Sequence, residues 1–255
     1  MPGPDMGGIV VIAHRGSSGV APENTMAAFR RAVAMGADMI EMDIRLTHDG
    51  IPVVLHDRTL RRTTGIRRRL RDARLDELHG LDAGSWFARS FRWEHIPTLR
   101  EVLEWLPQGT GINLELKTDG DRRRNGLLAD EVLRLLHMTG TEPVALVSSF
   151  DHRLLALLHR KRPTLRLGML MHPVRDRGRR PSRLARPIGA RTVICAAPTL
   201  RRATAEDTRS HALTLFSYGV QSRTRLLRVL RRGVNGVITD FPDRIRDILR
   251  REFPR

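Results

Sequence analysis

The sequence predicts an α/β fold in which eight parallel strands and their helices form a closed (β/α)8 barrel, with a small insertion after the second strand and its hairpin. A length of 255 residues suits one barrel of this kind. Apolar runs of strand length alternate with helical periodicity, which is typical of a parallel sheet. The runs are apolar throughout, which indicates strands covered on both faces. We therefore expect a single domain over residues 1–255.

Nine runs have the length and composition of strands. In chain order they lie at residues 8–14, 38–45, 51–56, 111–117, 143–148, 164–171, 191–197, 213–218 and 234–239. Helical periodicity fills most of the gaps, at residues 25–35, 98–106, 127–138, 151–160, 222–232 and 243–251. Asn24 and Thr25 are candidate caps of the first helix, which Gly36 ends. Residues 172–190 are expected to be the most loop-like segment.

Nine runs are one more than an eight-stranded barrel needs, and this excess has a local explanation. The runs 38–45 and 51–56 are too close for a parallel crossover, so they must pair in antiparallel fashion. Asp49 and Gly50 are a strong signal for a two-residue hairpin turn. With these residues at the turn centre, residue 43 lies opposite residue 56, which places His56 beside Asp43. Eight parallel strands remain, and one of them carries a hairpin extension.

Residues 57–97 match neither the strand period nor the helix period well. They combine a basic run, short helical fragments and two of the three tryptophans. This is long for a connection between a strand and a helix. We therefore expect a small insertion that lies over one end of the barrel.

The composition is strongly basic, with a net charge of +17 and arginine-rich runs at 61–74, 159–163 and 175–186. Such charge either attracts polyanions or forms solvated basic faces. Aromatic residues are 4% of the chain and do not interleave with the basic runs, which disfavours single-stranded nucleic acid as a partner. We expect no specific nucleic-acid binding and at most peripheral membrane contact through the basic patches.

Cysteine use and hydropathy indicate the compartment. Cys195 is the one cysteine, which excludes a disulfide within the chain and favours a reducing environment. The N-terminal residues lack the basic and apolar regions of a signal peptide. No apolar run reaches the roughly 18 residues that a membrane span needs. We expect a cytoplasmic protein, and the sequence does not determine its oligomeric state.

Polar residues end or interrupt several strand runs, and in a barrel the carboxyl ends of the strands form the active-site face. These residues are His14, Arg15, Glu41, Asp43, His56, Glu115 and Lys117. Taken alone, each of these residues is more typical of a surface ion pair or a structural histidine than of an active site. Their joint occurrence at one barrel mouth favours an active site. Glu41 and Asp43 point to one face of their strand, so they repel each other unless a cation lies between them. With Glu115 they offer the oxygen ligands that Mg²⁺ or Ca²⁺ prefers.

The motifs that carry these residues resemble the glycerophosphodiester phosphodiesterase family over residues 9–245. They are HRG at 14–16, PENT at 22–25, EMDIRLTHDGIPVVLHD at 41–57, ELK at 115–117, SSFDHRLL at 148–155 and GVNGVITDFPDR at 233–244. The resemblance implies a TIM barrel with an insertion at 57–97. It also implies metal-dependent hydrolysis of a small-molecule glycerophosphodiester to sn-glycerol 3-phosphate and an alcohol.

The resemblance assigns a role to each residue at the predicted mouth. His14 and His56 would be the general acid and base. Glu41, Asp43 and Glu115 would bind the divalent metal, Mg²⁺ or Ca²⁺. Arg15 would hold the phosphate, and Lys117 would stabilise its developing charge. Glu23, in PENT, would order a loop near the site or act as a helix-start acid. The negative charge of Asp43 would favour the protonated form of His56, which hints that His56 is the acid. The positive charge of the metal would oppose that protonation.

One segment departs from the family pattern. A Trp-Thr-Val-Asn segment is common late in this family, and here it aligns with Tyr218-Gly219-Val220-Gln221. Tyr218 would keep an aromatic wall against the substrate, while Phe241 would either line the mouth or pack in the core.

Two alternative functions remain open. One is a lysophospholipase D-type activity, with an apolar wall of Trp86, Phe87, Phe91 and Trp93; the other is a basic module that binds nucleic acid or membrane without catalysis.

Overall fold

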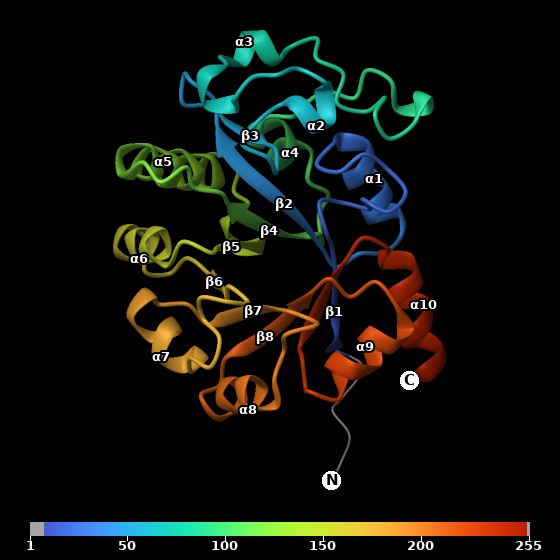
Figure 1. The fold of residues 1–255 in the computed structure, drawn as a ribbon, viewed down its shortest axis with the longest axis vertical. Coiled ribbons are helices and arrows are strands. Elements are labelled where there is room, and N and C mark those ends of the chain that lie inside the picture. Colours follow the sequence, from blue (N-terminus) through green and yellow to red (C-terminus); the bar gives the residue numbers. More distant parts are fainter. Residues whose placement is uncertain (1–7, 254–255) are drawn as a thin grey trace.

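Parallel strands close into a barrel in the computed structural model, which describes residues 8–253 (Figure 1). Within this part of the chain the strands are β1 (Val10–Ala13), β2 (Met39–Leu46), β3 (Pro52–Val54), β4 (Gly111–Leu116), β5 (Ala145–Ser149), β6 (Leu167–Leu170), β7 (Thr192–Ala196), β8 (Thr214–Tyr218) and β9 (Gly236–Thr239). Their order is β1-β9-β8-β7-β6-β5-β4-β2-β3, and pairing of β1 with β2 closes the ring. Strand β3 alone pairs antiparallel among the described residues. The predicted barrel of eight parallel strands and one hairpin is confirmed.

Helices pack around the outside of the barrel (Figure 1). Over residues 8–253 they are α1 (Met26–Ala34), α2 (Arg61–Thr64), α3 (Leu75–Leu78), α4 (Leu99–Trp105), α5 (Arg122–Met138), α6 (His152–Lys161), α7 (Pro181–Ala185), α8 (Arg202–Ser210), α9 (Arg223–Leu230) and α10 (Pro242–Glu252). No helix in this range combines the length and apolar character needed to cross a membrane.

Two helices were not expected from the sequence. Helix α7 lies inside residues 172–190, so the expectation of a loop is wrong for the second half of that segment. Helix α8 has a polar sequence and buries only Ala205 and Thr208, so its apolar period is too weak to detect.

The β2–β3 hairpin exists as predicted, but its turn is one residue longer than expected. Thr47 N–H donates to the carbonyl of Ile51, and Gly50 N–H donates to the carbonyl of Thr47. Gly50 has φ of 80°. This is a three-residue loop that ends in a left-handed residue, the common alternative to a two-residue turn.

The longer turn shifts the register of the hairpin by one residue. Ile44 pairs with Val54, so residue 43 lies opposite residue 55 and not opposite residue 56 as predicted. Leu55 N–H donates to the Asp43 carbonyl at 2.9 Å. Because a shift of one residue reverses the face of every side chain, His56 does not reach Asp43 as a cross-strand neighbour. It follows the end of β3 and approaches the site from there.

An apolar layer fills the interior of the barrel. One residue from each of several strands contributes to it: Ile12, Leu146, Leu170, Ile194, Phe216 and Ile238 are buried, and Met39 and Tyr218 pack against them. A larger cluster lies between the outer faces of the strands and the helices. The interior is therefore a packed core that closes the barrel beneath its carboxyl end.

The chain between β3 and α4 forms a layer of its own at the top of Figure 1, and it contains α2 and α3. It buries a separate hydrophobic cluster made of Val53, Leu55, Leu60, Leu70, Ala73, Leu78, Ala83 and Ile96. We call residues 57–97 the β3–α4 segment. Because its cluster includes residues of β3 and the following turn, the segment is anchored beside the barrel mouth.

Two glycines should respond in opposite ways to alanine. Gly50 has φ of 80° and a Cβ there would lie 2.9 Å from Leu127 Cδ2, so Gly50→Ala should destabilise the protein by about 1–2 kcal/mol. Gly126, inside α5, has open space around the position of a Cβ, so Gly126→Ala should stabilise it by about 0.5–1 kcal/mol. Urea unfolding of both variants measures the difference. Changes of the same sign would contradict the observed turn geometry.

Candidate active site

Three acids converge at the carboxyl end of the barrel. Side chains on one face of a strand recur every second residue. Glu41 therefore follows the interior residue Met39 on β2, and Asp43 follows Glu41. Asp43 is the register partner of Glu115 on β4. One oxygen from each of these three carboxylates lies within 4.8 Å of the others. The structure thus brings together the three residues expected to bind a metal.

Burial and nearby charges make the three carboxylates unequal. Glu41 is 2% exposed and Asp43 is 1% exposed. Burial and the charge of Asp43 raise the pKa of Glu41 well above its ordinary value, and burial also raises the pKa of Glu115. Burial alone would raise the pKa of Asp43, but Lys117 and Arg15 outweigh it and hold that pKa well below its usual range. Asp43 is therefore the most acidic member of the cluster.

One oxygen of the cluster lacks a protein partner. Glu41 Oε2 accepts the backbone N–H of Arg15 at 2.8 Å. The buried Glu41 Oε1 has no hydrogen-bond partner within residues 8–253. Leaving such an atom unpaired is costly. Three converging carboxylates with an unsatisfied oxygen are the hard donor set that Mg²⁺ and Ca²⁺ prefer, so these residues fit a divalent cation.

Two cationic side chains border the acids. Arg15 Nε lies 3.1 Å from Asp43 Oδ2, and Arg15 Nη1 donates to Glu23 Oε1 at 2.8 Å. Lys117 Nζ lies 3.0 Å from Asp43 Oδ1 and also pairs with Glu115. Burial opposes the charge on both cations, but Asp43 and the other acids outweigh it and raise the pKa of each. Both groups therefore stay charged at the mouth.

The turn after β1 directs Arg15 toward the acids. Arg15 has φ of 53°, which is uncommon for a residue with a side chain. At Gly16, with φ of 79°, a Cβ would lie 2.6 Å from the backbone of Ala28, so glycine is required. Asn24 has φ of 58°, and its Nδ2 donates to Asp43 Oδ2 at 2.8 Å. Such conformations persist where the surroundings impose them, and they cluster at functional sites.

His14 follows β1 and lies beside the acids. Its Nδ1–H donates to Asp240 Oδ1 at 2.7 Å, which orients the ring and leaves Nε2 as its other titratable nitrogen. Burial opposes protonation, but the Asp240 hydrogen bond and the charge of Glu41 outweigh it and raise the pKa of His14 above its ordinary value. Gln221 Oε1 accepts the backbone N–H of Asp240 at 2.9 Å, so Gln221 in turn holds the residue that orients His14.

His56 has a matching arrangement on the other side of the site. Its Nδ1–H donates to Asp57 Oδ1 at 2.7 Å. Burial lowers the pKa of His56; Asp43 favours the charged form, as expected, but burial together with Arg15 and Lys117 outweighs it. In both histidines, Nδ1 donates to a carboxylate, that of Asp240 for His14 and that of Asp57 for His56, and Nε2 is the nitrogen outside this contact.

Tyr218 and Phe241 are the aromatic residues considered for the substrate-binding wall. Tyr218 ends β8 and packs against the interior layer. Burial and the negative charge of Glu115 raise the pKa of its hydroxyl, so the ring lies within the field of the acids. At Gly19, in the turn after β1, a Cβ would lie 2.1 Å from the Phe241 ring. Phe241 therefore packs against this turn.

Sequence reasoning missed several residues that hold the site together. Asn24 was expected only as a helix cap, and Asp57 lies inside a recognised motif in which only its neighbour His56 received a role. Asp240 directly follows β9, so the signal that found His14, a polar residue at the end of an apolar strand, would have found it too. Arg62 lies in a basic run that is typical of a solvated surface, and it gave no signal.

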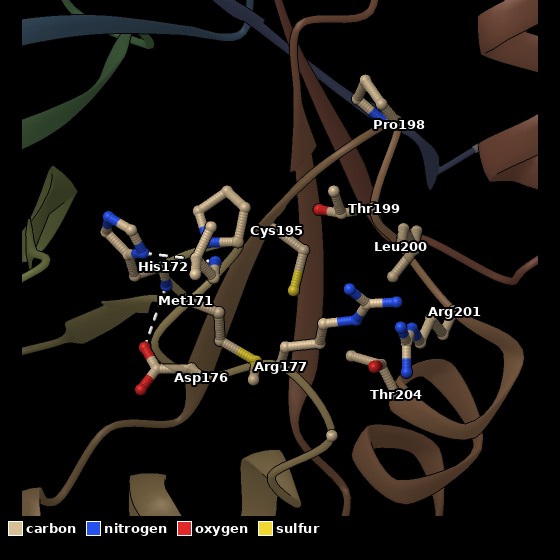
Figure 2. A pocket seen from close by; sticks show the side chains of 13 residues that line it. Met171, His172, Asp176, Arg177, Cys195, Pro198, Thr199, Leu200, Arg201 and Thr204 are labelled. Carbon is tan, nitrogen blue, oxygen red and sulfur yellow. Dashed lines mark hydrogen bonds between the residues drawn. The ribbon is translucent and has the colours of Figure 1, made fainter.

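A separate cavity of about 460 Å³ opens beyond the carboxyl ends of β6 and β7 (Figure 2). His172 and Asp176 lie on one side of it, where His172 N–H donates to Asp176 Oδ2 at 2.9 Å. Arg177 and Arg201 lie on the other side. The residues that line this cavity include none of those predicted for catalysis or metal binding. The convergent side chains at the ends of β1, β2 and β4 are therefore a different group from the residues that line this cavity.

Known proteins are similar to this chain in both sequence and fold. YhdW of Bacillus subtilis (strain 168) is 36% identical over 233 residues, which cover 91% of this chain and 95% of that protein. A glycerophosphodiester phosphodiesterase of Caldanaerobacter subterraneus subsp. tengcongensis is 34% identical over 248 residues, which cover 95% of this chain and 98% of that enzyme. An Oleispira antarctica phosphodiesterase, solved with the product sn-glycerol-3-phosphate, superposes with a TM-score of 0.87 at 29% identity and covers 94% of this chain and 96% of its own.

The barrel and the ionisable groups at its mouth define a TIM-barrel hydrolase. The chain belongs to the glycerophosphoryl diester phosphodiesterase family, which matches residues 14–244. It is therefore an enzyme, a glycerophosphodiester phosphodiesterase, and the family membership predicted from its motifs is confirmed. The alternative of a basic binding module without catalysis is set aside.

The contact between His14 and Asp240 can be tested directly. In the metal-free protein, Asp240→Asn should lower the pKa of His14, because the imidazolium loses its charged acceptor. An NMR titration of the histidine resonances measures the shift. Asp247→Asn, at an exposed position of α10, is the control and should leave the His14 titration unchanged. An unchanged His14 pKa in Asp240→Asn would contradict the observed contact.

Proposed function

We propose that this enzyme hydrolyses glycerophosphodiesters to sn-glycerol 3-phosphate and an alcohol, with a divalent metal and a pair of histidines, in one barrel domain. The observation that carries the proposal is the convergence of Glu41, Asp43 and Glu115 within 4.8 Å of one another. The product bound to the Oleispira antarctica relative supports the substrate class. The small-molecule diester is the expected partner.

Glu41, Asp43 and Glu115 would hold the metal, either Mg²⁺ or Ca²⁺. The unpartnered Glu41 Oε1 and the raised pKa values of Glu41 and Glu115 support this assignment, because a cation would satisfy the oxygen and favour both ionised forms. A bound divalent cation would supply a Lewis acid that offsets the charge of the phosphodiester.

Arg15 and Lys117 would bind the phosphate from the protein side. The planar guanidinium of Arg15 matches two phosphate oxygens, and its contacts with Glu23 and Asp43 hold it in one orientation. Lys117 carries a compact charge that would stabilise the negative charge that develops on the phosphoryl oxygens. Both groups are fixed by acids before substrate arrives, so little reorganisation is needed.

His14 and His56 would exchange protons with the reacting groups through Nε2. One takes a proton from the nucleophile, which forms the new P–O bond, and the other gives a proton to the alkoxide that leaves with the broken bond. The nucleophile is either water or the neighbouring glycerol hydroxyl of the substrate, which would form a cyclic phosphate that water then opens. The carboxylate on each Nδ1 holds the ring in one tautomer and orientation.

Tyr218 would form part of the substrate-binding wall. Its half-buried ring lies in the field of Glu115, and the hydroxyl adds a polar group where the family commonly has tryptophan. On the β3–α4 segment, Trp86 packs edge-to-face on Phe87 and lies 5.8 Å from the guanidinium carbon of Arg62. Comparing glycerophosphocholine with its monoacyl analogue tests whether these aromatics extend the substrate range to lysophospholipids.

Removal of either histidine should abolish turnover without unfolding the protein. His14→Ala and His56→Ala should each lower kcat by about 10²–10⁴-fold, because each removes one proton-transfer step. A glycerol 3-phosphate readout measures the loss. A substrate with a p-nitrophenolate leaving group needs no general acid, so only the variant that lacks the acid should regain activity on it. If either variant keeps near wild-type activity on both substrates, the acid/base pair is wrongly assigned.

Chelation should stop the reaction, and Mg²⁺ or Ca²⁺ should restore it. Glu41→Gln should weaken metal affinity by at least about tenfold, the lower end of what even outer-shell changes cost. Glu104→Gln, at an exposed position of α4, is the control and should bind metal as the wild type does. Isothermal titration of the metal-free proteins measures the affinities. Full activity after exhaustive chelation would refute metal dependence.

A further inference from the structure

Arg62 lies outside the predicted site, yet it connects two of its supports. Its Nε donates to Asp57 Oδ2 at 2.7 Å. Its Nη1 and Nη2 donate to the two carboxylate oxygens of Glu23, each at 2.7 Å. The planar fork of arginine allows one side chain to engage two carboxylates in this way. A single guanidinium therefore bridges the β1–α1 turn and Asp57, the third residue after β3.

Each carboxylate that Arg62 holds also holds a residue of the site. Asp57 Oδ1 accepts Nδ1–H of His56 at 2.7 Å. Glu23 Oε1 accepts Nη1–H of Arg15 at 2.8 Å. Without the guanidinium, Asp57 and Glu23 would each lose an outer partner, and neither would be held in the orientation that its inner contact needs. Arg62 thus acts on His56 and Arg15 without touching either of them.

The fold places Arg62 through its neighbours in the β3–α4 segment. Leu60 is 1% exposed and Thr63 is 5% exposed, so the short helix α2 is pinned on both sides of Arg62. Gly65, with φ of 78°, ends this helix. The Trp86 ring lies 5.8 Å from the guanidinium carbon on the outer side. Because α2 belongs to this segment (Figure 1), the segment supplies a part that the barrel itself lacks.

We infer that Arg62 is a positioning residue, which fixes His56 through Asp57 and Arg15 through Glu23. The inference rests on the proposed roles of His56 and Arg15. The Arg62 side chain is 40% exposed, so its ion pairs add little to stability. Its effect should instead appear in the reaction, since a misplacement of about 1 Å at a catalytic group costs up to about 100-fold in rate.

The single variants separate positioning from folding. Arg62→Ala should lower kcat/KM by about 100-fold while the urea midpoint stays near that of the wild type. Arg62→Lys should recover only part of the loss, because one ammonium cannot reproduce the fork to both carboxylates. Arg61→Ala, the neighbour in α2 that makes no ion pair within residues 8–253, is the matched control and should keep wild-type activity.

Double-mutant cycles test the two routes. Arg62→Ala combined with Asp57→Asn should be non-additive in kcat, since both act on His56. Arg62→Ala combined with Glu23→Gln should be non-additive in KM, since both act on the phosphate-binding Arg15. Additive cycles, full activity of Arg62→Ala, or a loss that follows the unfolded fraction would overturn the inference. A wild-type protein inactive with every metal and diester would instead overturn the proposed function.

Discussion

The burial of three carboxylates in the mouth of one barrel is the constraint on which the surrounding structure depends. Glu41, Asp43 and Glu115 repel one another, and each loses hydration on burial, so the fold must bring positive charge and hydrogen-bond donors to them. The turn after β1 supplies both, because Arg15 has a left-handed backbone there. Its N–H donates to Glu41, and its guanidinium pairs with Asp43. Within residues 8–253, Glu41 Oε1 has neither a hydrogen bond nor an ion pair, and a cation fits beside it.

The alternation of side chains along the strands separates this site from the core. Residues that point inward at the level of Ile12, Phe216 and Ile238 are apolar and fill the barrel. On the neighbouring strands β1 and β9, the next inward positions after Ile12 and Ile238 are taken by the polar residues His14 and Asp240. One register therefore sets both the floor and the site. A shift of β1 or β9 by two residues would put His14 or Asp240 into the apolar layer.

The sequence predicts the strands, the hairpin and the convergence of the acids, because each depends on local periodicity or on the rule that carboxyl ends meet at one face. The hairpin register did not follow from Asp49-Gly50, because a two-residue turn and a three-residue loop share that signal. Helix α8 did not follow either, because it buries little apolar surface. Arg62 could not be found, since nothing local distinguishes it from arginines on a solvated face. Its partners Glu23 and Asp57 meet only in the folded chain.

The charges around the site alternate outward in shells. Asp43 contacts Arg15, Arg15 contacts Glu23, and Glu23 contacts Arg62, so each charge has an opposite neighbour at or below 3.1 Å. Such alternation lets acidic and cationic side chains approach closely without net repulsion. The acids of this group lie together at the barrel mouth, although the chain as a whole carries a net charge of +17. A net charge of this size would favour the approach of anions at long range. The acids act only at short range, where Arg15 and Lys117 offset them and the proposed cation would add to this. The positive charge of the chain and the acids of the mouth thus act over different ranges, and salt should weaken the long-range effect more than the short-range contacts.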